Sequence, residues 1–333
     1  MADTMKAVDI KGGKGSAEDL FINSIEKPKV TPGNAIVKIK AFGINRMDII
    51  QRVGRYPLPP QAPSTLGVEF SGTIESVGDN DHGFKNGDAV FGLAYGGAYA
   101  EYISVSTKML IKKPDELSWE QAAAVPETWI TATQALHLIL GMEKGKSILW
   151  HAGASGVSIA GIQLSHLAGA SAVYATAGTD EKCDFIKSKL SATGAFNYKT
   201  QDWAEEIKKA TDGKGVDYIV DFVGGNYFQK NLDVCARDAR IVLLGTLSGG
   251  KVSDADISQI LFKRIRIEGS TLRSRDEDYQ GKLRDRLEQY VPSFVNGDLK
   301  IILDEVFTWE KIQEAHKHME DAKNSGKIVC TIP

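Results

Sequence analysis

The chain is poor in cysteine and has no excess of either charge. Its 333 residues include three cysteines, Cys183, Cys235 and Cys330, which are too few and too far apart for a disulfide framework or a CxxC metal knuckle. The 40 basic and 43 acidic residues give a net charge of −3. Such a balance provides no basic field for nucleic acid or an anionic membrane. We therefore expect the cysteines to be inert packing residues, and nucleic-acid binding to be absent.

Long apolar runs are also missing. No segment of 18 apolar residues occurs, and the first ten residues, MADTMKAVDI, contain no signal-peptide core. The apolar fraction of 42% and the charged fraction of 25% are those of a globular protein. These features predict a cytoplasmic protein with no membrane association. A length of 333 residues predicts two domains.

Metal-binding side chains are scarce in the first 125 residues, which contain no cysteine and a single histidine, His82. His316 and His318 are two positions apart, so on a helix they would face different sides. A tetrahedral zinc site needs three or four convergent Cys, His or carboxylate ligands. The sequence therefore predicts no metal site, and His151 is expected to be a packed residue at the end of a strand.

The most informative segment that is present covers residues 147–164, SILWHAGASGVSIAGIQL. Its pattern predicts a strand, a tight turn and a helix, the arrangement that binds a dinucleotide pyrophosphate at a helix N-terminus. Gly153 can take the backbone angles of the turn, and Ser155 and Gly156 are small enough for close approach. The pattern departs from G-x-G-x-x-G, because Ser155 and Ser158 replace the second and third glycines. Taken alone, it also fits an ordinary βα turn.

The chain changes character near residue 128. Before it, short alternating segments such as residues 35–41 predict a β-rich barrel or sandwich. After it, strands and helices alternate, which predicts a doubly wound parallel sheet. The expected strands of that sheet are residues 147–151, 172–176, 195–198, 216–221, 240–244 and 265–269. The last 60 residues predict a helix over 279–295 and a final strand over 327–332.

The choice of cofactor depends on the end of the second parallel strand. NAD sites usually carry an acidic residue there, about 20 positions after the first glycine. This chain has Val173-Tyr-Ala-Thr-Ala-Gly178, with no carboxylate, and Lys182 follows within one helical turn. That combination favours the 2′-phosphate of NADPH. Asp180 and Glu181 leave an alternative open, since they are either helix N-terminal charges or ribose ligands.

Three motifs in the β-rich half point to a known family: Gly67-Val68-Glu69-Phe-Ser-Gly72, Gly87-Asp88-x-Val90 and Gly97-Ala-Tyr-Ala-Glu101-Tyr102. Followed by a nucleotide domain, they resemble the medium-chain dehydrogenase/reductase superfamily. Zinc-containing members have a histidine where this chain has Val68, and a cysteine where it has Asn45. The chain therefore resembles the zinc-free quinone oxidoreductase branch.

Further segments are similar to the p53-inducible quinone oxidoreductase subgroup. They include Gly43-Ile-Asn45-Arg-Met-Asp48, Gln51-Arg-x-Gly54-x-Tyr56, Phe196-Asn-Tyr198, Leu261-Phe-Lys-Arg264 and Leu272-Arg-Ser-Arg275. The resemblance spans nearly the whole chain. It implies an α/β fold with a GroES-like β-rich catalytic domain, residues 1–127 and 271–333, and a Rossmann NADPH-binding domain, residues 128–270.

The resemblance also implies roles for individual residues. The pyrophosphate would be held by Gly153, Ser155, Gly156 and Val157, and the 2′-phosphate by Gly178, Lys182 and Tyr198. Phe222 and Val223 would flank the adenosine. The nicotinamide half would be lined by Asn45, Thr131, Leu244, Gly245, Thr246, Leu272 and Asn324. Tyr56 would face the substrate, and the hydroxyl groups of Tyr56 and Ser155 are candidate proton donors, with bulk water as the alternative.

The implied activity is NADPH-dependent, zinc-independent reduction of quinones by hydride transfer. Two alternatives remain open at this stage. One is reduction of α,β-unsaturated ketones or aldehydes, and the other is a low-turnover nucleotide-binding protein with a structural or RNA-binding role. The resemblance further implies a homodimer formed through the strand at residues 265–269, an edge that alternates isoleucine with charged residues.

Overall fold

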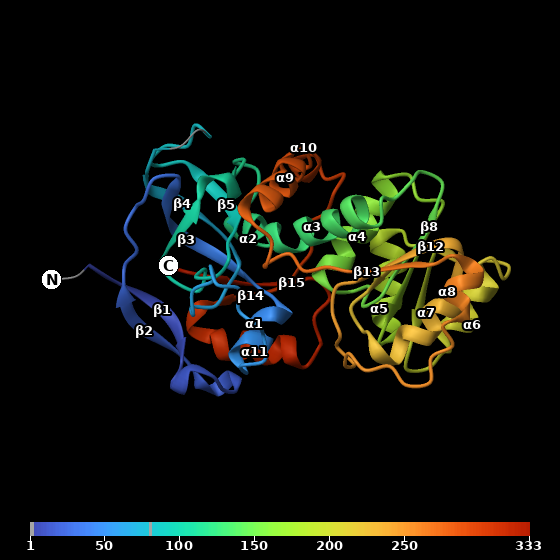
Figure 1. The fold of residues 1–333 in the computed structure, drawn as a ribbon. Helices are drawn as coiled ribbons and strands as arrows, with labels where there is room; N and C mark the ends of the chain where they lie inside the picture. Colours follow the sequence, from blue (N-terminus) through green and yellow to red (C-terminus); the bar gives the residue numbers. More distant parts are fainter. Residues whose placement is uncertain (1–2, 80–81) are drawn as a thin grey trace. The chain divides into compact units, whose positions relative to one another are not determined.

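The computed structural model describes residues 3–79 and 82–333, which fold into two compact units (Figure 1). We call Met1–Ile130 together with Arg273–Pro333 the β-rich unit, and Thr131–Leu272 the parallel-sheet unit. The chain thus leaves the first unit, completes the second, and returns.

The β-rich unit is built around a mixed sheet in the order β14-β15-β3-β4-β5-β7, with β6 paired to β3 and a separate β1-β2 hairpin. Its strands are β1 (Thr4–Ile10), β2 (Leu20–Glu26), β3 (Asn34–Ile44), β4 (Glu69–Val77), β5 (Ala89–Leu93), β6 (Tyr102–Ser106), β7 (Leu110–Lys112), β14 (Leu303–Thr308) and β15 (Lys327–Thr331). Its helices are α1 (Arg46–Arg52), α2 (Trp119–Ala123), α9 (Glu277–Glu288), α10 (Val291–Val295) and α11 (Ile312–Glu320), and α3 (Pro126–Thr133) crosses into the next unit. The C-terminal strand β15 pairs with β3, so segments nearly 300 residues apart are neighbours in one sheet.

The parallel-sheet unit has the strand order β10-β9-β8-β11-β12-β13, with every pair parallel. The strands are β8 (Ser147–Trp150), β9 (Ala172–Ala177), β10 (Gly194–Asn197), β11 (Val216–Asp221), β12 (Cys235–Leu243) and β13 (Arg266–Gly269), joined by helices α4 (Gly156–Leu167), α5 (Asp180–Leu190), α6 (Trp203–Ala210), α7 (Phe228–Val234) and α8 (Ser258–Lys263). This is the doubly wound order, whose direction reverses between β8 and β11. The α/β class and both expected architectures are confirmed.

Two local expectations were wrong. The helix predicted over residues 279–295 is two helices, because Pro292 lacks an N–H and is accommodated at the start of the second, α10. In the turn after β8, the positive φ of 49° falls on Ala152, and Gly153 is not a left-handed residue. A Cβ on Gly153 would lie 2.7 Å from both Ala175 Cβ and Ile186 Cδ1, so this glycine is needed for close packing of strand and helix.

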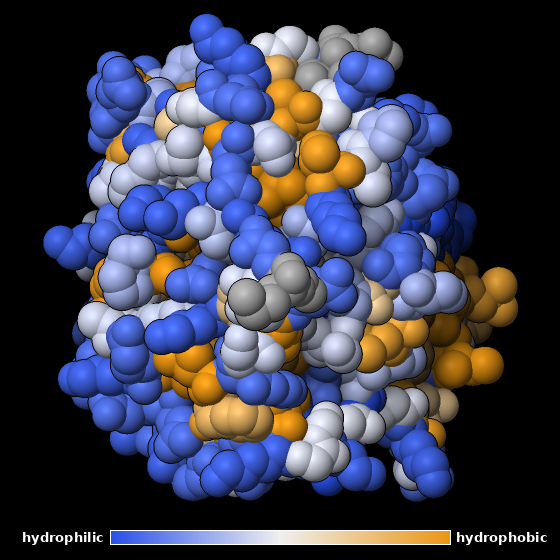
Figure 2. All heavy atoms as spheres, turned by 90° about the vertical axis from the view of Figure 1, so that its left-hand side faces the viewer, coloured by the Kyte–Doolittle hydropathy of each residue, from blue (hydrophilic) through white to orange (hydrophobic). Residues whose placement is uncertain are grey.

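Figure 2 shows one face, where hydrophilic side chains predominate and apolar residues form separate patches. The three cysteines are buried and free, as expected. Among the helices of the described segments, none has the length and apolarity that crossing a bilayer requires.

Candidate functional site

The turn between β8 and α4 ends in a capped helix N-terminus. Ser155 is the N-cap residue, and its hydroxyl accepts the N–H of Ser158 at 3.3 Å. The Ser158 hydroxyl in turn donates to the carbonyl of His151 at 2.8 Å. Because the first N–H groups of a helix have no partner within it, this capped end provides donors for an anion. Gly153, Ser155, Gly156 and Val157, the residues predicted to hold the pyrophosphate, all lie in this turn or in the first turn of α4.

The end of β9 gathers the residues predicted for the 2′-phosphate. A Cβ on Gly178 would lie only 2.6 Å from the Tyr198 hydroxyl, so glycine is required for the close approach of this ring. Tyr198 is 45% exposed, and Lys182 lies in the first turn of α5, whose N-cap is Thr179. Lys199 also approaches Gly178, with its Cε 3.5 Å from the Cβ position. The sequence reasoning missed Lys199, although a cation directly after Tyr198 was a usable signal.

Asp180 has a structural partner in this region. Its Oδ1 accepts a hydrogen bond from Asn197 Nδ2 at 2.7 Å, which ties α5 to the end of β10. This contact favours the interpretation of Asp180 as a helix N-terminal charge over that of a ribose ligand.

Behind these loops lies a buried polar network at the carboxyl ends of β8, β9 and β11. Asn231 Nδ2 donates to Asp221 Oδ2 at 3.0 Å, so Asn231 Oδ1 accepts the Nε2–H of His151 at 2.7 Å. His151 Nδ1 then accepts from the Thr176 hydroxyl at 2.9 Å. Burial lowers the pKa of His151, which keeps the imidazole neutral. His151 is thus a packed strand-end residue, as predicted.

Asp221 organises the loop that follows β11. Its Oδ1 accepts the N–H groups of Val223 at 2.6 Å and Gly224 at 3.2 Å. The loop after β12 is joined to it, because Leu244 N–H donates to the Asp221 carbonyl at 2.8 Å and Leu247 N–H to the Phe222 carbonyl at 3.0 Å. The structure therefore brings together five of the predicted cofactor residues, Phe222, Val223, Leu244, Gly245 and Thr246. Thr131 and Leu272, both buried, are the first and last residues of the unit.

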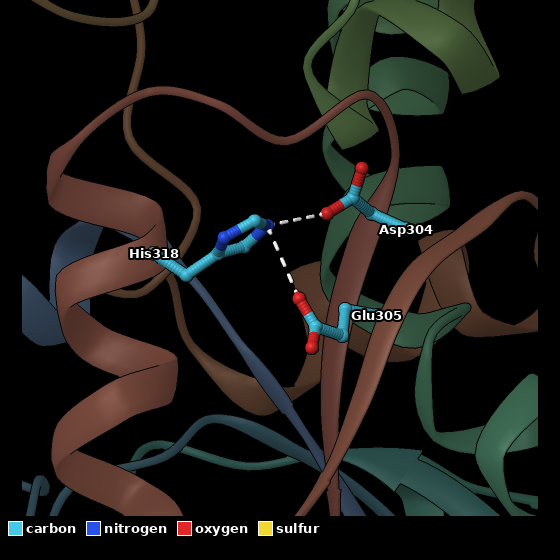
Figure 3. A group of neighbouring side chains, drawn as sticks. All are labelled: Asp304, Glu305 and His318. Atoms are coloured by element: carbon cyan, nitrogen blue, oxygen red, sulfur yellow. Dashed lines mark hydrogen bonds and ion pairs between the residues drawn. The ribbon is translucent and has the colours of Figure 1, made fainter.

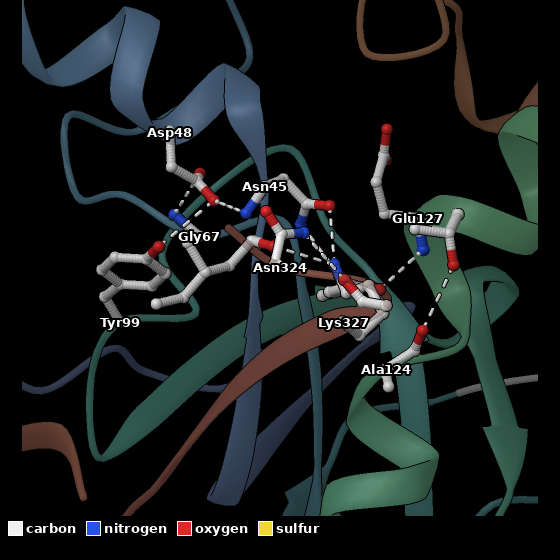
Figure 4. A network of polar contacts seen from close by, with 12 residues as sticks. Asn45, Asp48, Gly67, Tyr99, Ala124, Glu127, Asn324 and Lys327 are labelled. Carbon is white, nitrogen blue, oxygen red and sulfur yellow. Dashed lines mark hydrogen bonds and ion pairs between the residues drawn. The ribbon is translucent and has the colours of Figure 1, made fainter. Parts of the chain in front are cut away.

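In the β-rich unit, Asn45 belongs to a buried charged network (Figure 4). Its Nδ2 donates to Glu69 Oε1 at 2.9 Å, and its Oδ1 accepts from Lys327 Nζ at 2.8 Å. Lys327 and Glu69 also form an ion pair whose side chains are 6% and 0% exposed. Glu69 stands in the motif at residues 67–72, but no local pattern assigns a role to Lys327, since the two lie 258 positions apart.

A second network starts at Asp48 and crosses the same unit. Arg52 Nη1 lies 3.0 Å from His316 Nδ1, and since a guanidinium only donates, the His316 proton is on Nε2 and points to the Tyr99 oxygen at 3.1 Å. Tyr99 then donates to Asp48 Oδ2 at 3.2 Å. Burial raises the pKa of Asp48 to about 6 and lowers that of His316 to about 3. His316 is therefore neutral at physiological pH.

Tyr56, the residue predicted to face the substrate, lies beside a cation. The Arg273 guanidinium carbon is 5.3 Å from the centre of the Tyr56 ring. Arg273 is held by the Tyr95 carbonyl at 2.6 Å and by Gln51 Oε1 at 2.7 Å. Burial is the largest influence on Tyr56 and raises its pKa, so the phenol stays protonated. Asn324 is turned toward its own loop, where Nδ2 donates to the Gly326 carbonyl at 3.0 Å.

His318, two positions from His316, takes part in a different group at the surface (Figure 3). Its Nε2 is 2.6 Å from Asp304 Oδ2 and 3.7 Å from Glu305 Oε2. A register shift in β14 between Leu303 and Glu305 coincides with this use of two consecutive carboxylates. The three ligand atoms lie within 4.8 Å of one another, a convergence that sequence spacing did not predict. Here the His318 imidazole is hydrogen-bonded to Asp304 within a partly exposed polar cluster.

Two family models match the chain. Residues 31–115 match the alcohol dehydrogenase GroES-like domain, and residues 156–289 match the zinc-binding dehydrogenase domain. Human quinone oxidoreductase is 29% identical over 325 residues, which cover 96% of this chain and 95% of that protein. The low-reducing polyketide synthase drtA of Aspergillus calidoustus is 30% identical over 323 residues, and the chain spans only 13% of its length.

Solved structures agree in fold over almost the entire chain. An NAD-dependent alcohol dehydrogenase superposes with a TM-score of 0.86 at 30% identity, covering 99% of this chain and 100% of that one. The CurK enoyl reductase superposes with a TM-score of 0.83 at 27% identity, with the same coverage of both chains. Together with the two matched domains, these relatives show that the chain belongs to the medium-chain dehydrogenase/reductase superfamily, as a quinone oxidoreductase-like oxidoreductase.

Proposed function

We propose that this protein is an NADPH-dependent reductase of quinones that requires no zinc. The parallel-sheet unit would be the cofactor domain and the β-rich unit the catalytic domain. The observation that carries the proposal is the Asn45–Glu69–Lys327 network. It places the Asn45 amide, held by a buried carboxylate and a buried ammonium, at a position where zinc-containing members of the superfamily carry a cysteine.

Support for NADPH comes from the residues around Gly178. Lys182 and Lys199 provide cations near the exposed Tyr198 hydroxyl, and no carboxylate ends β9. A 2′-phosphate favours such charge-assisted donors. Gly153 and the capped start of α4 would hold the pyrophosphate. A residue with a Cβ at position 153 would collide with Ala175 of the sheet and Ile186 of α5.

The chemistry requires little of the protein beyond binding and orientation. When bound, NADPH supplies a hydride, and a quinone that accepts it becomes a hydroquinone anion. The anion then takes one proton. Tyr56, whose raised pKa keeps it protonated, and Ser155 are the side chains proposed to supply it, with solvent as the other source. Arg273 beside the Tyr56 ring would stabilise the phenolate left after transfer.

The test is NADPH oxidation with a panel of quinones and a panel of enones, before and after exhaustive chelation. We expect quinone turnover that chelation leaves unchanged. Activity that disappears together with stoichiometric zinc would contradict the proposal. Faster turnover of the enones would favour the second candidate, which the similarity to CurK enoyl reductase supports. Binding of NADPH without turnover of either panel would favour the structural or RNA-binding alternative.

We further propose that the protein works as a cytoplasmic homodimer joined along β13. This strand is one edge of the parallel sheet, and the neighbouring Leu261 and Phe262 are 73% and 70% exposed. Light scattering at micromolar concentration should give about twice the chain mass of 36.2 kDa. Ile267→Pro removes a donor from the edge and should shift the protein toward monomer. A wild-type monomer at that concentration would refute the dimer.

A further inference from the structure

The amide of Asn45 is held at both ends by opposite charges. Lys327 Nζ donates to its oxygen at 2.8 Å, and its nitrogen donates to Glu69 Oε1 at 2.9 Å. An ammonium can only donate and a carboxylate can only accept. Rotating the amide by 180° would set N–H against ammonium and oxygen against carboxylate. The ion pair therefore dictates which end of Asn45 is the donor.

Lys327 has no spare N–H, and both carboxylate oxygens of Glu69 already accept hydrogen bonds. The three hydrogens of Lys327 are used by the Ile44 carbonyl at 2.9 Å, by Asn45 and by Glu69. The second carboxylate oxygen of Glu69 accepts the N–H of Glu127 at 2.9 Å. Asn45 differs, because its amide nitrogen carries two hydrogens and Glu69 takes one. One N–H of Asn45 is therefore left to donate elsewhere.

The surroundings fix the pair in this geometry. A Cβ on Gly43 would lie 2.3 Å from Glu69 Oε1, so the carboxylate occupies space that only glycine leaves open. The backbone N–H of Asn45 is bound by Asp48 Oδ2 at 2.8 Å, which holds the residue at the start of α1. A buried ion pair stabilises the fold less than an apolar pair of the same volume, because both charges lose their hydration. Orienting Asn45 is a function that would account for the presence of the ion pair.

We propose, building on the function given above, that Lys327 is a positioning residue for hydride transfer. Through Glu69 and the Asn45 oxygen it aims the free N–H of Asn45 at the quinone oxygen on which negative charge develops. As the quinone takes up the hydride, an electron pair moves through the conjugated ring onto that oxygen to give the hydroquinone anion, and a fixed donor stabilises the charge. Asn45 is then the catalytic donor, and Lys327 acts only through it.

The principal test is the double variant Glu69→Gln/Lys327→Met, which removes both charges at similar volume. The introduced glutamine can present either end of its own amide, so the Asn45 orientation is no longer imposed. We expect log(kcat/KM) to depend more steeply on the reduction potential of the quinone. The poorest acceptors should lose about a hundredfold in rate, comparable with removal of one donor to a developing oxyanion. The KM for NADPH should not change.

Two comparisons separate positioning from stability. In an Asn45→Ala background the same double change should cause no further loss of rate, because the group it positions is gone. The control Arg284→Met/Glu288→Gln removes another buried cation and its partner from the same unit, on α9. It should lower the melting temperature and leave the potential dependence unchanged. Equal slopes in wild type and the Glu69/Lys327 variant would overturn the proposal.

A spectroscopic measurement tests orientation without turnover. In protein labelled with ¹⁵N-asparagine, the Asn45 side chain, assigned through Asn45→Ala, should give two sharp, distinct N–H resonances. These should broaden or merge in the double variant. If that variant does not fold, Lys327→Arg, which keeps a charged donor, should retain the wild-type slope while Asn45→Ala steepens it; identical slopes would refute positioning. Absence of quinone turnover in wild type would refute the proposed function instead, whereas the resonances would still report on the ion pair.

Discussion

The two units bury polar groups in different ways. In the β-rich unit the buried charged residues are Asp48, Arg52, Glu69, Arg273, Arg284 and Lys327. In the described part of the parallel-sheet unit, Asp221 is the one buried residue with a formal charge, and its partners are neutral. The first unit therefore buries several charges, among which Glu69 and Lys327 form an ion pair with each other and Arg284 forms one with Glu288, whereas the second buries one carboxylate that accepts from backbone and amide N–H groups.

The difference reflects how each unit is assembled. In a doubly wound sheet, the strand ends meet along one edge, so Thr176, Asp221 and His151 come together through topology alone. In the β-rich unit, β3 and the returning C-terminal strand β15 are neighbours in one sheet. Its polar partners are consequently far apart in sequence, and each network also fastens the C-terminal segment to the rest of the unit.

The largest effect should come from breaking one buried ion pair. Lys327→Met leaves the Glu69 carboxylate without its cation, and we expect a loss of about 3–5 kcal/mol in the free energy of unfolding. Denaturant titration measures this loss, and the additional Glu69→Gln change should restore most of it. A loss below about 1 kcal/mol for the single variant would show that water reaches the site.

The second largest effect should be a pH dependence of stability that arises from buried His316 in the β-rich unit. Folded His316 stays neutral down to about pH 3, whereas an unfolded histidine takes up a proton below its ordinary value of 6.5. The stability that neutral His316 contributes is therefore full above pH 6.5 and is lost as the pH falls toward 3. The pKa of Asp48 is about 6 in the folded protein and 3.8 in an ordinary aspartate, so its contribution to stability changes with pH in the opposite direction. Asp48 is present in both proteins that are compared.

We accordingly expect the stability advantage of wild type over His316→Gln to shrink with acidification. The decrease should be about 1.4 kcal/mol for each pH unit below 6.5. Unfolding curves recorded between pH 7 and pH 4 provide the measurement. A pH-independent difference would mean that His316 is already charged, or reached by water, in the folded protein.

In the parallel-sheet unit, Asp221→Ala should have a smaller effect. It removes a carboxylate that accepts from Val223, Gly224 and Asn231, and hydrogen bonds to a charged group contribute about 1.5–3 kcal/mol. We expect a loss of that size, with weaker NADPH binding because the loop after β11 is freed. Asp184→Ala, which removes an exposed ion pair on α5, is the control and should cost less than about 0.5 kcal/mol. Similar losses for the two variants would contradict the role of Asp221.

The smallest expected effect concerns a half-buried cation, Lys182, and leaves folding intact. Lys182→Ala should raise the KM for NADPH by about tenfold to a hundredfold, and that for NADH far less, since one charge-assisted contact to a phosphate is lost. Lys189→Ala, in the last turn of the same helix, should change neither constant. Equal effects of Lys182→Ala on both cofactors would restore Glu181 as a candidate ribose ligand.

Local patterns predicted the parallel-sheet unit well. The expected strand at residues 216–221 is β11 itself, and the strand, turn and helix predicted over residues 147–164 are β8, the turn after it and α4. The predictions were wrong where the role of a residue depends on neighbours that are distant in the sequence. Gly153 was assigned a backbone role, but its packing against Ala175 and Ile186 requires the folded sheet and α5.

The sequence by itself determined the class of fold, the strand, turn and helix over residues 147–164, and the absence of cysteine and histidine at positions 45 and 68, because each depends on local periodicity or on residue identity. Only the tertiary structure decided that Lys327 meets Glu69 and Asn45, that Arg52 fixes the tautomer of His316, and that Arg273 lies over Tyr56. Such contacts join segments hundreds of residues apart. No local pattern encodes them, since the energy that selects them appears only when charges are buried together in the folded core.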